Sequence, residues 1–320
     1  MAITSSLSPS AHARSIATRA AIAAGAAALL TLSLASCSAA TADAAGSGDS
    51  AVSYAADENT LVFGVVPDSV DTQTNYQPLM DYIEAETGKT VEYHESTDYA
   101  ALIEAAIAGK IDVASFSGFT YLTATTNGAA ITPISSIVTE QGQEPGYFSQ
   151  AIVPVDSPIT SLEEFAGKKV CFVDPSSTSG YLFPSYNLLE AGVDPVADVT
   201  PVFAGKHDVS VTKVGEGKEC EVGFAEDSEV AKSDKVKVIG ETMVPGAPIV
   251  VSDTLPAEMK TQLTDLLSQV SIDDIIASGI TSADTEAFRA TFYSTEPVND
   301  AYYDTIRDIC VKTQASQCQG

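Results

Sequence analysis

The sequence is poor in the side chains on which most catalytic and metal sites depend. It has three histidines and no tryptophan among 320 residues. Beyond residue 37 only His94 and His207 remain, and neither stands in a zinc-ligand spacing. The chain also lacks a Gly-x-Ser-x-Gly elbow, a Walker loop and a dinucleotide fingerprint. We therefore expect no metal, no cofactor and no catalytic centre. The pairs Asp273-Asp274 and Glu226-Asp227 are interpreted as solvated helix starts rather than as general acids and bases.

Basic residues are scarce as well. The sequence has 16 Lys and Arg against 43 Asp and Glu, and its formal net charge is −27. Such a charge argues against a nucleic-acid partner, and repulsion from anionic lipid argues against broad membrane contact. An anionic ligand would have to be recognised by fixed dipoles in a dry cleft rather than by long-range attraction.

Residues 1–36 predict a secretory signal peptide. Two arginines precede an apolar run from Ala20 to Leu34, which is too short and too rich in alanine for a comfortable membrane span. The run ends in Leu34-Ala35-Ser36-Cys37, which closely resembles a bacterial lipobox. We expect cleavage before Cys37 and a lipid on its thiol, with a plain signal peptide as the alternative. Residues 37–60 then form a flexible tether, poor in groups to bury, on the extracytoplasmic face of the membrane.

Four cysteines remain for disulfide bonds after Cys37 is lipidated. An even number is expected in an oxidising compartment, and four cysteines allow three pairings. Cys171 and Cys220 each open an expected strand of the same lobe, whereas Cys310 and Cys318 are neighbours near the C-terminus. We favour the pairs Cys171–Cys220 and Cys310–Cys318.

The most informative stretch is Asp174–Pro184, which places hydroxyl residues at a turn between a strand and a helix. Ser176, Ser177, Thr178 and Ser179 follow the apolar run 170–173 and precede an expected helix. Such a turn combines unpaired backbone N–H groups, the positive end of the helix dipole and several hydroxyl donors. It is a site for a small tetrahedral oxyanion. The alternative is that a single serine caps the helix.

Strand and helix patterns alternate over most of the chain, which predicts an α/β fold with two mainly parallel or mixed sheets flanked by helices and with ligands at the carboxyl ends of the strands. Two segments, 147–155 and 245–253, are interpreted as hinge crossings. Lobe one would then comprise residues 61–146 plus 250–320, and lobe two residues 147–249. Two lobes closing around a cleft form a binding protein of the type II periplasmic architecture. A single three-layer domain is the alternative.

Several segments of the chain together carry a family resemblance. The lipobox, Ile111-Asp112-Val113-Ala114, Gly146-Tyr147, the turn with His207 about thirty residues later, and Val244–Pro248 together resemble the phosphate-, phosphite- and phosphonate-binding proteins of ABC importers. The resemblance covers about Leu61 to Ile280. It implies two α/β lobes that close on a small phosphorus oxyanion and deliver it to a membrane permease.

The resemblance also implies which residues contact the ligand. The oxyanion contacts match Ser177, Thr178 and Ser179, the histidine donor matches His207, and two tyrosines match Tyr99 and Tyr147. Tyrosine and histidine donate to phosphoryl oxygen without a lysine. A bound anion should raise the His207 pKa, so that binding weakens as the pH rises through that value.

One position departs from the family pattern. Members that take aminoalkylphosphonates carry an acid near the second crossing, where this chain has Ala247. Glu226 and Asp227 are secondary candidates to contact the ligand in its place.

The sequence therefore predicts a lipid-anchored, monomeric solute-binding protein for phosphite, phosphate or a small phosphonate. A sensor lipoprotein that presents a small oxyanion to a membrane kinase is the first alternative, and an extracellular hydrolase is the weaker one.

Overall fold

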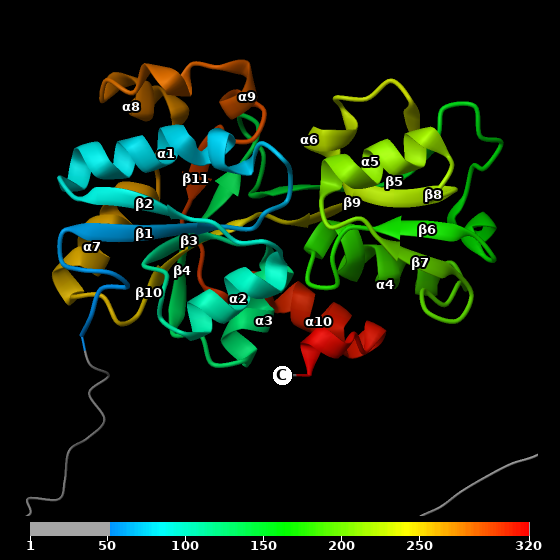
Figure 1. Ribbon diagram of the computed structural model, residues 1–320, viewed down its shortest axis with the longest axis horizontal. Helices are drawn as coiled ribbons and strands as arrows, with labels where there is room; N and C mark the ends of the chain where they lie inside the picture. Colours follow the sequence, from blue (N-terminus) through cyan, green and yellow to red (C-terminus); the bar gives the residue numbers. More distant parts are fainter. Residues whose placement is uncertain (1–51, 320) are drawn as a thin grey trace, which may run out of the picture. The chain divides into compact units, whose positions relative to one another are not determined.

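The computed structural model describes residues 52–319. The predicted signal peptide, Cys37 and most of the tether lie outside these residues. Over the described range the chain folds around an 11-stranded mixed sheet in the order β2-β1-β3-β10-β4-β5-β8-β6-β7, with β11 paired to β4 and β9 paired to β5. Helices cover both faces of this sheet (Figure 1). In the same range no helix is both long enough and apolar enough to cross a membrane.

Lobe one is built on the first part of the sheet. Its strands are β1 (Thr60–Val65), β2 (Thr90–His94), β3 (Val113–Ser115), β4 (Ile131–Val138), β10 (Pro248–Ser252) and β11 (Ser294–Glu296). Its helices are α1 (Thr72–Thr87), α2 (Tyr99–Ile107), α3 (Gly118–Thr126), α7 (Ala257–Leu267), α8 (Ile272–Ala277) and α9 (Glu286–Arg289). Strands β1, β2 and β3 are parallel, and β10 runs antiparallel between β3 and β4.

The period of two in β1 explains how lobe one is layered. Leu61, Phe63 and Val65 point to one face, where they pack with α1, α7, α8 and α9. Val62 points to the other face, towards α2 and α3. Both faces of a central strand are therefore apolar, as expected for a sheet covered by helices on both sides.

Lobe two is built on the second part of the sheet. Its strands are β5 (Gly146–Pro154), β6 (Lys169–Phe172), β7 (Thr200–Phe203), β8 (Val222–Glu226) and β9 (Val236–Pro245), and its helices are α4 (Phe183–Glu190), α5 (His207–Glu216) and α6 (Asp227–Val230). Short 3₁₀ turns at Leu162–Phe165, Thr281–Ala283, Asp300–Tyr303 and Ser316–Cys318 complete the chain. The disulfide Cys171–Cys220 ties β6 to the segment before β8, as expected.

The two lobes are joined where the sheet is narrowest. Strands β4 and β5 share a single residue pair, Val138 with Gly146, and the chain returns from β9 to β10 through Gly246 and Ala247. The sequence predicted two separate sheets, whereas the structure has one sheet that narrows to this pair. The physical reason is that β5 and β9 pair with each other along their whole lengths and so carry the ladder up to the crossing. The prediction of a two-lobed α/β fold is confirmed.

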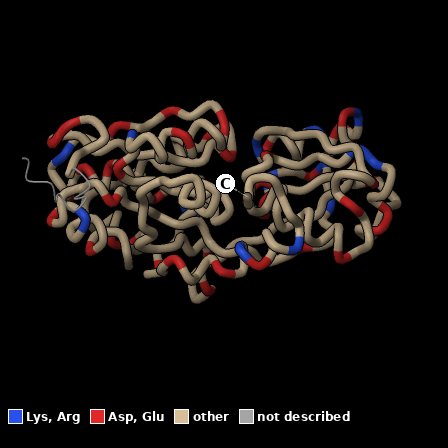
Figure 2. The backbone as a smooth tube through the Cα atoms, turned by 90° about the horizontal axis from the view of Figure 1, so that it is seen from below, with Lys and Arg blue, Asp and Glu red and all other residues tan. Residues whose placement is uncertain are grey.

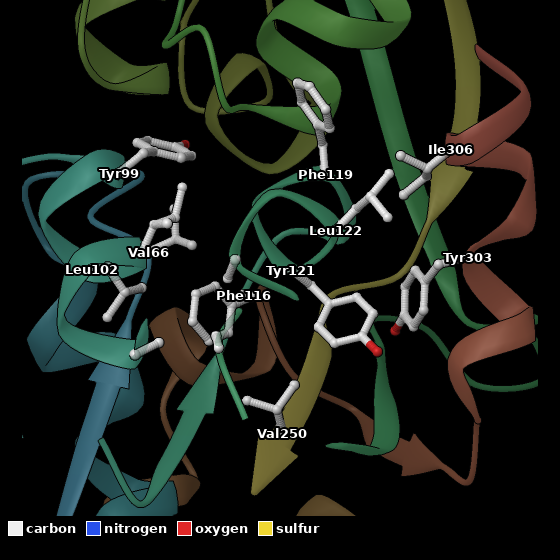
Figure 3. Packing of buried hydrophobic residues seen from close by; sticks show 14 of the residues in the cluster. Val66, Tyr99, Leu102, Phe116, Phe119, Tyr121, Leu122, Val250, Tyr303 and Ile306 are labelled. Atoms are coloured by element: carbon white, nitrogen blue, oxygen red, sulfur yellow. The ribbon is translucent and has the colours of Figure 1, made fainter. Parts of the chain in front are cut away.

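The C-terminal helix α10 (Asp304–Thr313) packs against both lobes. It contacts α3 of lobe one and α4 of lobe two, and the disulfide Cys310–Cys318 closes the turn that follows it. Figure 3 shows Tyr303 beside Tyr121 and Ile306 beside Leu122, within a buried cluster that also contains Leu182 and Phe183 of lobe two. The sequence assigned this segment to lobe one alone. Amphipathic periodicity shows that a helix has an apolar face, but it does not show what covers that face.

Candidate ligand-binding site

A cavity of about 80 Å³ lies between the two lobes. This volume is several times the roughly 10–15 Å³ that a cavity needs to admit one water, and it suits a molecule of few heavy atoms. It is bounded by the carboxyl ends of β1, β3 and β8 and by the start of β5, as expected for an α/β sheet. Its polar lining residues include Asp68, Tyr99, Tyr147, His207, Glu226 and Asp227.

The hydroxyl turn folds as predicted, between β6 and α4, but it does so through a π-helical turn, Thr178–Leu182. The Ser177 hydroxyl accepts a hydrogen bond from the Gly180 N–H at 3.0 Å, so Ser177 caps the turn. Gly180 is required because a Cβ there would lie 2.4 Å from the Cβ of Val173. The capping interpretation and the anion interpretation are thus both compatible with Ser177.

Two hydrogen bonds join this turn to α3 across the cleft. The Phe119 N–H donates to the Thr178 hydroxyl at 2.7 Å, and the Thr120 hydroxyl donates to the Ser176 carbonyl at 2.9 Å. Thr178 is fully buried by this contact. Its oxygen therefore joins the lobes, a role that the sequence did not indicate.

Two further hydrogen bonds close the opposite side of the cleft. The backbone N–H of His207 donates to the backbone carbonyl of Asp68 at 2.8 Å, and the Lys206 ammonium donates to the Ser69 carbonyl at 2.9 Å. Together with the contacts of α3, they show that the lobes are in a closed arrangement.

Ser179 is the turn residue with an uncommitted hydroxyl. It is fully buried and its Oγ has no hydrogen-bond partner within the described part of the chain, although its carbonyl accepts a bond from the Ser149 hydroxyl at 2.6 Å. The turn lies behind the cavity wall rather than on it, because Tyr99 and Tyr147 line the cavity and approach Ser177 and Ser179 respectively.

The two tyrosines are built to act as donors. Burial raises the pKa of Tyr99 and that of Tyr147 well above the usual value. Both hydroxyls therefore keep their protons and can donate to an anion. Tyr99 begins α2, which Asp98 caps by accepting the Ala101 N–H, and Tyr147 lies in β5 at the hinge.

His207 begins α5 and is almost completely buried. Its Nδ1 accepts a hydrogen bond from the Glu226 N–H at 2.9 Å, so the proton of the neutral ring is on Nε2. Burial lowers the pKa of His207 to about 4. The imidazole is therefore a neutral donor at ordinary pH, and its titration lies far below the neutral range.

Two carboxyl groups share this end of the cavity. Glu226 was a secondary candidate, whereas sequence reasoning missed Asp68, whose signal was its position just after β1. Burial, with the nearby Glu226 carboxyl, raises the pKa of Asp68 to about 7. Burial, with the nearby Glu229 carboxyl, raises the pKa of Glu226 to about 8. Asp227 also lines the cavity, and burial raises its pKa. Ala247 lines the cavity without supplying an acid.

Comparison with known proteins identifies the family of this chain. Residues 63–299 match the model of the ABC transporter, phosphonate, periplasmic substrate-binding protein family. The chain is 36% identical over 285 residues to the phosphate-import protein PhnD of Mycolicibacterium smegmatis, which covers 82% of this chain and 88% of that protein. It is 27% identical over 227 residues to the phosphonates-binding periplasmic protein of Escherichia coli, covering 65% of each.

Solved structures agree on the fold. A binding protein component of an ABC phosphonate transporter from Pseudomonas aeruginosa has a TM-score of 0.68 at 24% identity, covering 81% of this chain and 87% of that one. PhnD1 from Prochlorococcus marinus in complex with methylphosphonate also has a TM-score of 0.68, at 17% identity, covering 80% and 99%. With the family model spanning most of the described lobes, the chain belongs to the periplasmic substrate-binding proteins of phosphonate ABC transporters.

Proposed function

We propose that this protein captures a small phosphorus oxyanion, namely phosphate, phosphite or a small phosphonate, and delivers it to an ABC permease. The observation that carries the proposal is the set of neutral donors at the cavity. Tyr99, Tyr147 and the Nε2–H of His207 border it, the free hydroxyl of Ser179 lies behind it, and no lysine or arginine of the described residues lines it. Relatives named for phosphate import and for phosphonate binding support this ligand class.

In this proposal the oxyanion binds between the tyrosines and the hydroxyl turn. The hydroxyls of Ser177, Thr178 and Ser179 and the N–H groups of Thr178 and Ser179 face it once the tyrosine rings swing off the turn, whereas the Ser177 N–H stays bonded to the Asp174 carbonyl. Glu226 and Asp227 contact the groups of the ligand on the far side. Water is excluded when the lobes close, which strengthens each of these hydrogen bonds.

We place the boundaries of the lobes at the hinge, with lobe one at residues 61–146 plus 250–320 and lobe two at 147–249. Closure about this hinge holds the ligand, and opening releases it to the permease. We further propose that the protein acts as a monomer on the extracytoplasmic face of the cell membrane, tethered by a lipid on Cys37 after removal of residues 1–36.

Calorimetry and thermal-shift assays with phosphate, phosphite, methylphosphonate and 2-aminoethylphosphonate test the ligand class. A ligand at 100 times its Kd should stabilise the protein by about 2.7 kcal/mol. Because Ala247 supplies no acid, methylphosphonate should bind more tightly than 2-aminoethylphosphonate. Tyr147→Phe should weaken phosphate at least about tenfold by removing one donor to a charged ligand. The proposal is wrong if none of the four compounds stabilises the protein.

A further inference from the structure

Asp68 and Glu226 reach the same end of the cavity from different lobes. Asp68 follows β1 in lobe one, and Glu226 ends β8 in lobe two. His207 contacts both residues, because its backbone N–H donates to the Asp68 backbone carbonyl at 2.8 Å and its ring Nε2 is 3.8 Å from Glu226 Oε2. Closure of the lobes is therefore what brings the two carboxyl groups together.

Each carboxyl group has one oxygen committed and one oxygen free. The Thr72 hydroxyl donates to Asp68 Oδ1 at 2.7 Å, and the Ser228 hydroxyl donates to Glu226 Oε1 at 2.9 Å. Neither Asp68 Oδ2 nor Glu226 Oε2 accepts a hydrogen bond from the residues that the structure describes. These two oxygens are available to a ligand.

The charges around the pair do not neutralise it. Lys206 bonds a backbone carbonyl, and Lys232 pairs with Glu229 at 2.6 Å. The other titratable neighbours are acids, phenols or the neutral imidazole, and they come from every element packed against the pair: Tyr76 of α1, Tyr93 of β2, Tyr99 of α2, Tyr147 of β5, His207 and Asp208 of α5, and Asp227 and Glu229 of α6. A dianion placed here would face two carboxylates, and the nearby cation, Lys232, which lowers the pKa of Glu226, is already paired with Glu229.

Such an arrangement is stable only if protons lie between the carboxyl oxygens and the ligand oxygens. We propose that Asp68 and Glu226 each share one proton with the bound oxyanion, so that the site selects oxyanions that carry an O–H group. The proposal rests on the proposed function and names the chemistry by which the same site distinguishes its ligands. The raised pKa values of both carboxyl groups agree with it.

The proton count gives the proposal a quantitative form. Two hydrogen bonds need two protons, one for each carboxyl group. Hydrogen phosphate, HPO₄²⁻, brings one in its P–OH, and the second comes from solvent when both carboxyl groups are ionised in the free protein. Sulfate brings none, so both protons have to come from solvent, one more than for phosphate. The site should therefore disfavour sulfate relative to phosphate, most strongly above pH 8, although the two ions match in size and shape.

Calorimetry of phosphate binding at pH 8.5, in buffers of different ionisation enthalpy, measures the proton uptake directly. We expect about one proton taken up per phosphate, and therefore an affinity that falls about tenfold per pH unit above pH 8. Sulfate, which needs one proton more, should bind at least about a hundredfold more weakly than phosphate at pH 9.5, where both carboxyl groups are ionised in the free protein.

The double variant Asp68→Asn, Glu226→Gln keeps the shape and the bonds from Thr72 and Ser228, but its amides donate without a proton from solvent. It should take up no proton, lose the pH dependence, and discriminate against sulfate at least about tenfold less than the natural protein. Asp71→Asn, an exposed acid in the same loop as Asp68, is the control that should change none of these values.

Phosphate binding by the natural protein at pH 8.5 without proton uptake, or sulfate binding within about tenfold of phosphate at pH 9.5, would overturn the inference while leaving the proposed function intact. Tightest binding of 2-aminoethylphosphonate, lost in the double variant, would overturn it in favour of an ammonium site. Failure to bind any phosphorus oxyanion would overturn the proposed function and this inference together.

Discussion

At the scale of single residues, the hydroxyls of one turn perform different tasks. Ser177 caps the π-helical turn, Thr178 accepts a hydrogen bond from the other lobe, and Ser179 keeps a free hydroxyl beside Tyr147. A hydroxyl that is already bonded within the protein gains less from a ligand than one that is buried and unpaired. Removing each hydroxyl should therefore have a different consequence.

Ser179→Ala should weaken phosphate binding about 10- to 150-fold and leave the melting temperature of the ligand-free protein nearly unchanged. The reason is that a hydrogen bond to a charged group is worth about 1.5–3 kcal/mol, while the Ser179 hydroxyl has no hydrogen-bond partner among residues 52–319. Calorimetry and thermal unfolding measure the two effects separately.

Thr178→Val is the matched comparison, because it removes the acceptor of the Phe119 N–H and leaves that buried donor unpaired. Thr178→Val should lower both the melting temperature of the ligand-free protein and its affinity for phosphate. Equal affinities of Ser179→Ala and the natural protein would contradict the role given to Ser179.

At the scale of elements, the C-terminal segment acts on both hinge crossings. The Tyr302 hydroxyl donates to the Pro145 carbonyl in the first crossing and accepts from the Gly246 N–H in the second. The Tyr303 hydroxyl donates to the Gly246 carbonyl at 3.3 Å. Gly246 must be glycine, because a Cβ would lie 2.4 Å from the Ser136 hydroxyl oxygen and 2.8 Å from the Ile137 carbonyl oxygen. This segment therefore fixes the geometry about which the lobes turn.

Tyr302→Phe should favour more open lobes in the ligand-free protein. The phenyl ring keeps the packing but loses both bonds to the crossings, so the binding-competent conformation is less populated and the apparent Kd rises by the same factor. Small-angle X-ray scattering should show a larger radius of gyration without ligand and an unchanged radius with saturating phosphate. Tyr54→Phe, which lies outside the hinge, controls for the loss of a phenol hydroxyl. Identical scattering of Tyr302→Phe and the natural protein would show that Tyr302 does not hold the two crossings together.

At the scale of the whole molecule, the electrostatic field of the net negative charge repels an anion, whereas the donors of the site attract it. The net charge is −27, and acidic residues are spread over both lobes with few basic residues among them (Figure 2). An incoming anion is therefore repelled until it reaches the donors of the cleft. Neither disulfide restrains the motion of the lobes directly, because Cys171–Cys220 lies within lobe two and Cys310–Cys318 lies within the C-terminal segment.

Raising the salt concentration from 10 to 150 mM should therefore increase the association rate of phosphate by a factor of about 2–10. Screening shortens the range of the repulsion from about 30 Å to about 8 Å, whereas the hydrogen bonds in the closed cleft are hardly screened. The dissociation rate should change less. Stopped-flow measurements with a chloride salt, which should not occupy the site, give both rates. An association rate that falls with salt would show that a positive local potential outweighs the net charge.

The sequence by itself determined the local and the compositional features of this protein. The apolar runs set the strands, the order of strands and helices set the two-lobed α/β fold, and the Ser-Thr-Ser-Gly turn set the oxyanion hypothesis. The positions of Cys171, Cys220, Cys310 and Cys318 also led to the disulfides that the structure contains. These features depend on backbone preferences and on neighbours in the chain, which periodicity and spacing report directly.

Only the tertiary structure decided how the groups of the site divide their tasks. Thr178 meets the Phe119 N–H across 59 residues of sequence, Asp68 meets Glu226 through closure of the lobes, and α10 packs on both α3 and α4. The donor that satisfies a hydroxyl, the burial that raises a carboxyl pKa and the surface that covers an apolar face all come from distant segments. The physical reason is that these energies depend on what surrounds a group in space, which the local pattern of the sequence does not contain.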